Sequence, residues 1–178
     1  YVKFFDSDNG VIVCGYAKSN DTNESSRIYS TSNGGESWDI VGSGPATNII
    51  KGVVYVSSDV GFFCYDYVEG MDSNLYKTDD GGKTFAKVML EEQELDSSAA
   101  NPQGQETETK TDSGKNGADS SEQLRWGDVY KEALTPVVDS TGIITIYLTQ
   151  GKNAVYNDGK TAAKYQSSDK GSTWKYIG

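Results

Sequence analysis

The sequence predicts an all-β protein built from repeated units, and three observations support this prediction. Short runs rich in β-branched and aromatic residues, such as 53–56 and 143–148, are separated by turns of Gly, Asn and Asp. No segment has a sustained helical period, although residues 126–134 fit either one helical turn or an irregular strand. One eight-residue motif also recurs three times along the chain, which is typical of repeated small sheets.

The recurring octet has a hydroxyl residue first, Asp or Asn third, Gly fifth and an aromatic residue eighth. Its key residues are Thr31, Asn33, Gly35 and Trp38 in the first copy, Thr78, Asp80, Gly82 and Phe85 in the second, and Ser167, Asp169, Gly171 and Trp174 in the third. The Asp or Asn and the hydroxyl suit hydrogen bonds to backbone N–H groups of a turn, and Gly suits a positive φ. We therefore expect each octet to be a structural hairpin between two strands.

The spacing of the octets defines the predicted units. The first two copies start at residues 31 and 78, whereas the third starts at residue 167. Residues 97–123 contain no Val, Ile, Leu, Met, Phe, Trp or Tyr, so we interpret the longer interval as one unit plus a disordered insertion. The predicted single domain 1–178 contains a first unit at 1–45, a second at 46–92, an acidic insertion at 93–124 and a third at 125–178.

Composition excludes several classes of function. Residues 91–124 contain nine acidic and two basic residues, so this segment carries most of the net charge of −10. No cluster of Lys and Arg is present, so we expect no nucleic-acid partner. No apolar run approaches the ~18 residues of a membrane span. The chain has no His, which excludes Ser-His-Asp catalysis and His-based metal sites, and we expect neither a metal nor a cofactor.

The octet resembles the Asp-box, or BNR repeat, whose pattern is Ser or Thr, any residue, Asp, any residue, Gly, two further residues, and Trp or Phe. The second and third copies match this pattern, and the first departs from it at Asn33. The resemblance implies a β-propeller-like array of about three four-stranded blades, in which each box joins the third and fourth strands. Asp-box proteins include sialidases, xyloglucan-cleaving hydrolases, sortilin-type domains and photosystem II assembly-factor-like propellers.

Three blades are fewer than the four to eight of a closed propeller. Either the chain is a fragment of a larger propeller completed by flanking sequence, or it pairs with another copy as a homo-oligomer, or a degenerate blade hides in the third unit. The sequence leaves these alternatives open.

The resemblance to sialidases raises the question of an active site. Sialidases hold the substrate carboxylate with three Arg residues, and this chain has only Arg27 and Arg125. A complete sialidase site is therefore not expected within the chain.

A glycoside hydrolase needs only two carboxyl groups in a cleft, and one segment offers candidates. Asp66, Glu69 and Asp72 lie close in sequence to Tyr65 and Tyr67, and Tyr is a residue type that stacks on sugars. This cluster is a candidate catalytic and sugar-binding site. The alternative is a solvated loop at the end of a strand.

Two further pairs of residues have alternative interpretations. Asp6 and Asp8 suggest either a calcium loop or a plain turn, and we prefer the turn because Gly10 replaces a third ligand. Cys14 and Cys64 follow equivalent Gly residues at different offsets, which places them on opposite faces of their strands. We expect buried free thiols, with a disulfide as the alternative.

These observations favour a non-catalytic interaction or scaffold module of an exported bacterial protein, extracellular or at the cell surface. The abundance of Tyr, Asn, Ser and Gly and the scarcity of Arg suit a secreted protein. The alternative is a carbohydrate-active module, either a hydrolase of the sialidase-like superfamily or a sugar-binding domain. The expected partner is accordingly a protein or a glycan.

Overall fold

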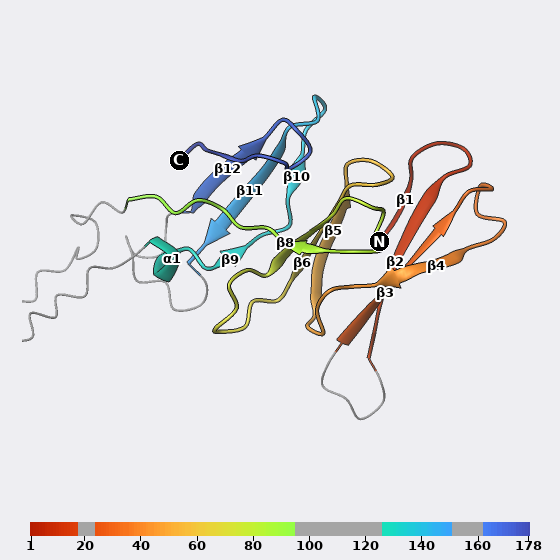
Figure 1. The fold of residues 1–178 in the computed structure, drawn as a ribbon, viewed down its shortest axis with the longest axis horizontal. Helices are drawn as coiled ribbons and strands as arrows, with labels where there is room; N and C mark the ends of the chain where they lie inside the picture. Colours follow the sequence, from red (N-terminus) through yellow and green to blue (C-terminus); the bar gives the residue numbers. More distant parts are fainter. Residues whose placement is uncertain (18–23, 95–125, 151–161) are drawn as a thin grey trace, which may run out of the picture.

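A computed structural model describes residues 1–17, 24–94, 126–150 and 162–178 and shows three antiparallel sheets (Figure 1). This confirms the all-β prediction. Within the described residues the helical content is the single turn α1 (Trp126–Val129). The predicted insertion at 93–124 lies outside the described residues from residue 95 onward.

The three sheets fall within the three predicted units. The first sheet contains β1 (Val2–Phe4), β2 (Gly10–Ala17), β3 (Glu24–Thr31) and β4 (Asp39–Ser43); the second contains β5 (Ile50–Tyr55), β6 (Gly61–Tyr65), β7 (Leu75–Thr78) and β8 (Ala86–Lys87). The third contains β9 (Glu132–Ala133), β10 (Val137–Val138), β11 (Ile144–Thr149), β12 (Ala163–Ser167) and β13 (Lys175–Tyr176).

The third sheet corrects one detail of the prediction, because it has five strands and not four. The additional strand β9 pairs with β11 through Ala133 and Leu148. Residues 126–134, for which the sequence allowed either a helical turn or a strand, form both in succession.

Each octet joins the third and fourth strands along the main path of its sheet, at β3–β4, β7–β8 and β12–β13. The first residue of each octet pairs with the preceding strand at an equivalent position. These pairs are Gly10 with Thr31, Gly61 with Thr78, and Ile144 with Ser167. The three sheets therefore share one register, in which Ile144 takes the place of Gly10 and Gly61.

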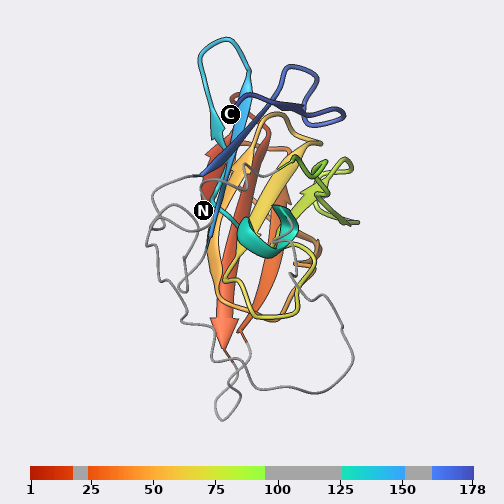
Figure 2. The ribbon, with the colours of Figure 1, turned by 90° about the vertical axis from the view of Figure 1, so that its left-hand side faces the viewer.

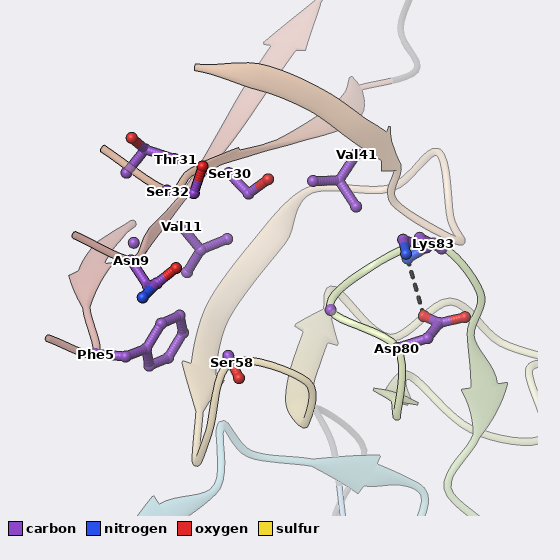
Figure 3. Close-up of a pocket in the computed structure, with 12 residues that line it drawn as sticks. Phe5, Asn9, Val11, Ser30, Thr31, Ser32, Val41, Ser58, Asp80 and Lys83 are labelled. Atoms are coloured by element: carbon purple, nitrogen blue, oxygen red, sulfur yellow. Dashed lines mark hydrogen bonds between the residues drawn. The ribbon is translucent and has the colours of Figure 1, made fainter. Parts of the chain in front are cut away.

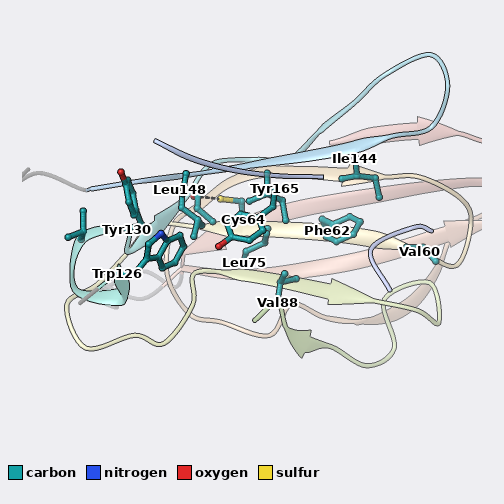
Figure 4. Close-up of a cluster of buried hydrophobic side chains, with 14 residues drawn as sticks. Val60, Phe62, Cys64, Leu75, Val88, Trp126, Tyr130, Ile144, Leu148 and Tyr165 are labelled. Atoms are coloured by element: carbon teal, nitrogen blue, oxygen red, sulfur yellow. Dashed lines mark hydrogen bonds between the residues drawn. The ribbon is translucent and has the colours of Figure 1, made fainter. Parts of the chain in front are cut away.

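The sheets stack face to face in sequence order, with the second sheet in the middle (Figures 1 and 2). One buried cluster, which includes Val11, Val13, Phe63 and Tyr65, lies between the first and second sheets. A larger cluster lies between the second and third sheets (Figure 4). In the described part of the chain the stack is open, so the first and third sheets each have an outer face.

Strand β6 explains why the middle of the chain is so apolar. All five of its residues are buried, because Phe63 and Tyr65 face the first sheet while Phe62 and Cys64 face the third. Alternating side chains of a strand point to opposite faces, so a strand buried on both sides is a continuous apolar run.

The cysteines differ from the prediction of two buried thiols. Both are free, as expected, and Cys64 is buried, but Cys14 is exposed. Cys14 lies on β2 opposite Arg27, with its side chain on the outer face of the first sheet. No further sheet covers that face among the described residues, so the burial predicted for Cys14 is wrong.

Candidate functional site

The octets are the most regular feature of the structure, and the second copy illustrates their geometry. The Thr78 hydroxyl donates to Asp80 Oδ1 (2.8 Å) and accepts from the Gly82 N–H (2.8 Å). Asp80 Oδ1 also accepts from the N–H groups of Lys83 and Thr84, both at 2.9 Å. Asp80 Oδ2 accepts from the Thr84 hydroxyl at 2.6 Å. Both carboxylate oxygens are thus engaged within their own turn.

The third octet repeats this arrangement, with Asp169 accepting from Ser167, Ser172 and Thr173. These hydrogen bonds stabilise the charged carboxylate. They lower the pKa of Asp169, chiefly through the Thr173 hydroxyl, and the pKa of Asp80, chiefly through the Thr84 hydroxyl.

The first octet forms the same turn with a neutral side chain. Asn33 Oδ1 accepts from the Thr31 hydroxyl (2.8 Å) and the Ser37 N–H (3.0 Å). Its amide Nδ2 donates to Ser37 Oγ (2.9 Å), which reverses the hydroxyl hydrogen bond seen in the other copies. The turn therefore requires the Oδ1 acceptor and tolerates the loss of charge.

The fifth position of the octet is Gly for two reasons. It has a positive φ in every copy, 106° at Gly82 and 78° at Gly171. The turn also lies against the preceding sheet: a Cβ on Gly82 would be 3.1 Å from Ile28, and one on Gly171 would be 2.5 Å from Phe62. The second and third octets therefore contact the sheet that precedes their own.

The acids of the predicted carboxylate cluster are engaged in ion pairs. Each of its acids makes an ion pair with a different lysine. The pairs are Lys51–Asp66 (3.1 Å), Lys131–Glu69 (3.2 Å) and Lys87–Asp72 (2.7 Å). All three carboxylates are substantially exposed, and Lys87 lowers the pKa of Asp72. A general acid requires the opposite shift, toward neutral pH.

The two tyrosines beside this cluster differ in burial. Tyr65 is fully buried between the first and second sheets, and its hydroxyl is 2.9 Å from Ser26 Oγ. Its ring has no exposed face on which a sugar ring stacks. Tyr67 is only partly exposed.

One pocket lies between the first and second sheets, at the end that carries the octets (Figure 3). It has a volume of about 210 Å³ and is lined by apolar Phe5, Val11 and Val41 and by polar residues that include Asn9 and Asp80. A second pocket of about 100 Å³ lies beside Trp126 and Tyr130. Both are smaller than the ~300–1,000 Å³ typical of ligand sites.

The predicted turn at Asp6 is present. Asp6 Oδ1 accepts from the N–H groups of Asp8 and Asn9, both at 2.8 Å, so its carboxylate is engaged within the loop. The described residues contain no group of three or more His, Cys, Asp or Glu side chains placed to hold a metal ion. They also contain no helix that is long and apolar enough to cross a membrane.

The outer face of the first sheet is the surface that sequence reasoning missed. Cross-strand neighbours Val2, Ile12, Tyr29 and Ile40 form one row across it, and Val2 and Ile40 are 61% and 62% exposed. Phe4 lies nearby and packs edge-on against Trp38. The period-two alternation of β2 was visible in the sequence, but both of its faces carry apolar residues, so alternation did not identify the outer one.

No protein-family model matches the chain, and no curated protein shows significant similarity to its sequence. The assignment of a function therefore depends on the sheets, their octets and the surfaces they present.

Proposed function

We propose that the chain is a non-catalytic interaction module of the Asp-box type, with its three sheets as blades of a propeller-like array. The octets support this, because each joins the third and fourth strands of its sheet and hydrogen-bonds the side-chain oxygen of its Asp or Asn within its own turn. We place the module in an exported bacterial protein, since the composition is rich in Tyr and Gly and poor in Arg.

A catalytic role is disfavoured by the same residues that the sequence offered for it. Asp66, Glu69 and Asp72 are each paired with a lysine, and the Tyr65 ring is buried. The pocket beside Val41 and the pocket beside Trp126 are each small for a saccharide. No observation favours the carbohydrate-active alternative, so we do not propose it.

The observation that carries the interaction role is the outer face of the first sheet. Large apolar side chains are exposed to solvent on this face, including Val2, Phe4, Tyr16 and Ile40. Extended apolar patches are uncommon on the surfaces of monomeric proteins and mark sites of association. This face is therefore the binding surface in our proposal.

Site-specific photo-crosslinking in the producing cells tests this role. A photoreactive phenylalanine replaces Ile40 on the outer face, and a matched control replaces Ser140, which is exposed in the turn before β11. We expect a protein adduct from position 40 and none from position 140. Equal or absent labelling at the two positions would refute an interaction role for this face.

A further inference from the structure

The two contacts between sheets use the same pair of faces in the same direction. Gly10, Gly61 and Ile144 occupy equivalent positions in the three sheets. The residues one and three positions after each of them point to one side of the sheet, which we call the forward face. The residues two and four positions after each of them point to the other side, which we call the backward face. The forward faces carry Val11 and Val13, Phe62 and Cys64, and Thr145 and Tyr147; the backward faces carry Ile12 and Cys14, Phe63 and Tyr65, and Ile146 and Leu148.

At each contact a forward face meets the backward face of the next sheet. Val11 and Val13 of the first sheet share a buried cluster with Phe63 and Tyr65 of the second. The forward face of the second sheet likewise packs on the backward face of the third; the residues involved are Phe62, Cys64, Ile146 and Leu148. The stack is therefore a directional repeat, and the same joint occurs twice.

Among the residues that the structure describes, this repeat leaves one face of each kind uncovered at the ends of the stack. The free backward face is on the first sheet and includes Ile12, Cys14 and Ile40. The free forward face is on the third sheet and includes Thr145 and Tyr147, with Tyr147 37% exposed. The two free faces are therefore of the same two kinds that pack on each other at both contacts within the chain.

The first octet provides a second, independent indication. The octets of the second and third sheets each contact the sheet before their own, through Gly82 and Gly171. The first octet is built in the same way, but no sheet precedes it among the described residues. Its Trp38 packs on Phe4 and remains partly exposed on the free backward face. Gly35 of this octet meets Phe4 of its own sheet, where Gly82 and Gly171 meet Ile28 and Phe62 of the preceding sheet.

We infer that the third sheet of a second copy of this chain covers the free backward face. The proposal rests on the proposed interaction role and names the partner of the same surface. The forward face of the third sheet of each copy packs on the backward face of the first sheet of the other. Two such heterologous joints close a symmetric dimer of six sheets, a number within the range of closed propellers.

The composition of the free forward face sets the strength of this contact. Thr145 occupies the position of Val11 and Phe62 in the other two sheets, and Tyr147 the position of Val13 and Cys64. The ammonium group of Lys164 lies 5.9 Å from the centre of the Tyr147 ring. The joint between copies is therefore more polar than the joints within the chain. We expect a reversible dimer whose population depends on protein concentration.

Sedimentation equilibrium of the 178-residue chain is the first test. We expect a mass that rises with concentration from 19.3 kDa toward twice that value and then stays constant. A monomer at all accessible concentrations overturns the proposal. Continued growth beyond the dimer also overturns it, because an unclosed heterologous joint forms open chains.

Two charge variants test which faces meet. Ile40→Glu alters the free backward face and Tyr147→Glu the free forward face, and Ser140→Glu is the exposed control. We expect each face variant to be monomeric alone and the control to dimerise. An equimolar mixture of Ile40→Glu and Tyr147→Glu should regain a dimer with one intact joint. A dimer made by joining two first sheets would survive Tyr147→Glu, and that result would overturn the proposal.

Both face variants replace exposed side chains, so circular dichroism and the thermal unfolding midpoint of each monomer should match those of the wild-type monomer. The cysteines add a probe that needs no substitution of the interface. Cys14 is exposed on the free backward face, whereas Cys64 is buried and burial raises its pKa to about 11.

We expect one rapidly labelled thiol, at Cys14, in dilute wild-type protein and protection of that thiol at concentrations where the dimer forms. Tyr147→Glu should abolish this protection. Unchanged Cys14 labelling across the transition would overturn the proposed interface. If the chain is monomeric while a probe at Ile40 captures a different protein, self-association fails and the interaction role stands.

Discussion

The third residue of the octet allows a stringent test, because the chain itself contains both Asp and Asn at this position. Asp80→Ala removes the acceptor for the backbone N–H groups of Lys83 and Thr84 and for two hydroxyls. The carboxylate is near the surface, so water replaces part of what is lost. We expect a cost of about 1–3 kcal/mol in the free energy of unfolding.

Asp80→Asn should cost less, below about 1 kcal/mol at neutral pH, because an amide oxygen still accepts both N–H groups. The hydroxyl of Thr84 would then accept from the amide, as Ser37 does from Asn33. Asn33→Asp is the reciprocal control and should stabilise the chain slightly at neutral pH, since it restores a charge-assisted acceptor.

The pH dependence has a defined sign. Hydrogen bonds, first of all that from the Thr84 hydroxyl, lower the pKa of Asp80 in the folded state below 3.8. The unfolded chain therefore binds the proton more readily. The stabilisation from the Asp80 carboxylate is present above the unfolded-state pKa and is lost as the pH falls from there toward the folded-state pKa. The difference in free energy of unfolding between the wild type and Asp80→Asn should therefore shrink in this acidic range.

Urea unfolding followed by Trp fluorescence measures these differences, at pH 7 and at a pH of about 2.5, below the unfolded-state value. Two results would refute the reasoning. One is a cost for Asp80→Asn at pH 7 as large as that for Asp80→Ala. The other is a difference between wild type and Asp80→Asn that does not shrink in acid.

Four further predictions concern other parts of the chain. Tyr65→Phe should cost about 1–3 kcal/mol by leaving Ser26 Oγ without its partner between the sheets, and a double-mutant cycle with Ser26→Ala should show positive coupling in urea unfolding. Lys170→Gly should raise the free energy of unfolding by about 0.5–1 kcal/mol, because Lys170 has a φ of 57°, and a loss of stability would contradict the assigned strain. Replacing residues 97–123 with a short Gly-Ser linker should leave the thermal midpoint nearly unchanged; a large drop would show that this segment packs on the sheets. Wild-type protein should not turn over chromogenic sialosides, glucosides or soluble β-glucans, and turnover that Glu69→Gln abolishes would refute the non-catalytic assignment.

The candidate site shows what a local sequence pattern predicts and what it leaves out. The pattern placed Asp66, Glu69 and Asp72 in one short segment, as candidates for a shared site. Each carboxylate pairs with a lysine from a different part of the chain, at Lys51, Lys131 and Lys87. Lys51 and Lys87 lie on β5 and β8 of the second sheet, whereas Lys131 directly precedes β9 of the third. These pairings depend on strand order and sheet stacking, and no local pattern contains that information.

By itself the sequence determined the octets and the strands beside them. The side-chain hydrogen bonds of the first and third octet residues connect residues at most four positions apart, so the hydroxyl, Asp or Asn, and Gly specify the turn locally. The recurrence of the octet then specified the three sheets.

Tertiary structure alone decided which face of each strand is covered. Val11 and Ile12 are equally apolar neighbours on β2, yet Val11 packs against the second sheet and Ile12 faces outward. Tyr65 is buried and Cys14 exposed for the same reason, although the two residues are equivalent in the repeat. Alternation assigns residues to two faces, but burial requires a neighbouring sheet. Only the order of the stack supplies that neighbour, and it leaves the first backward face and the last forward face open.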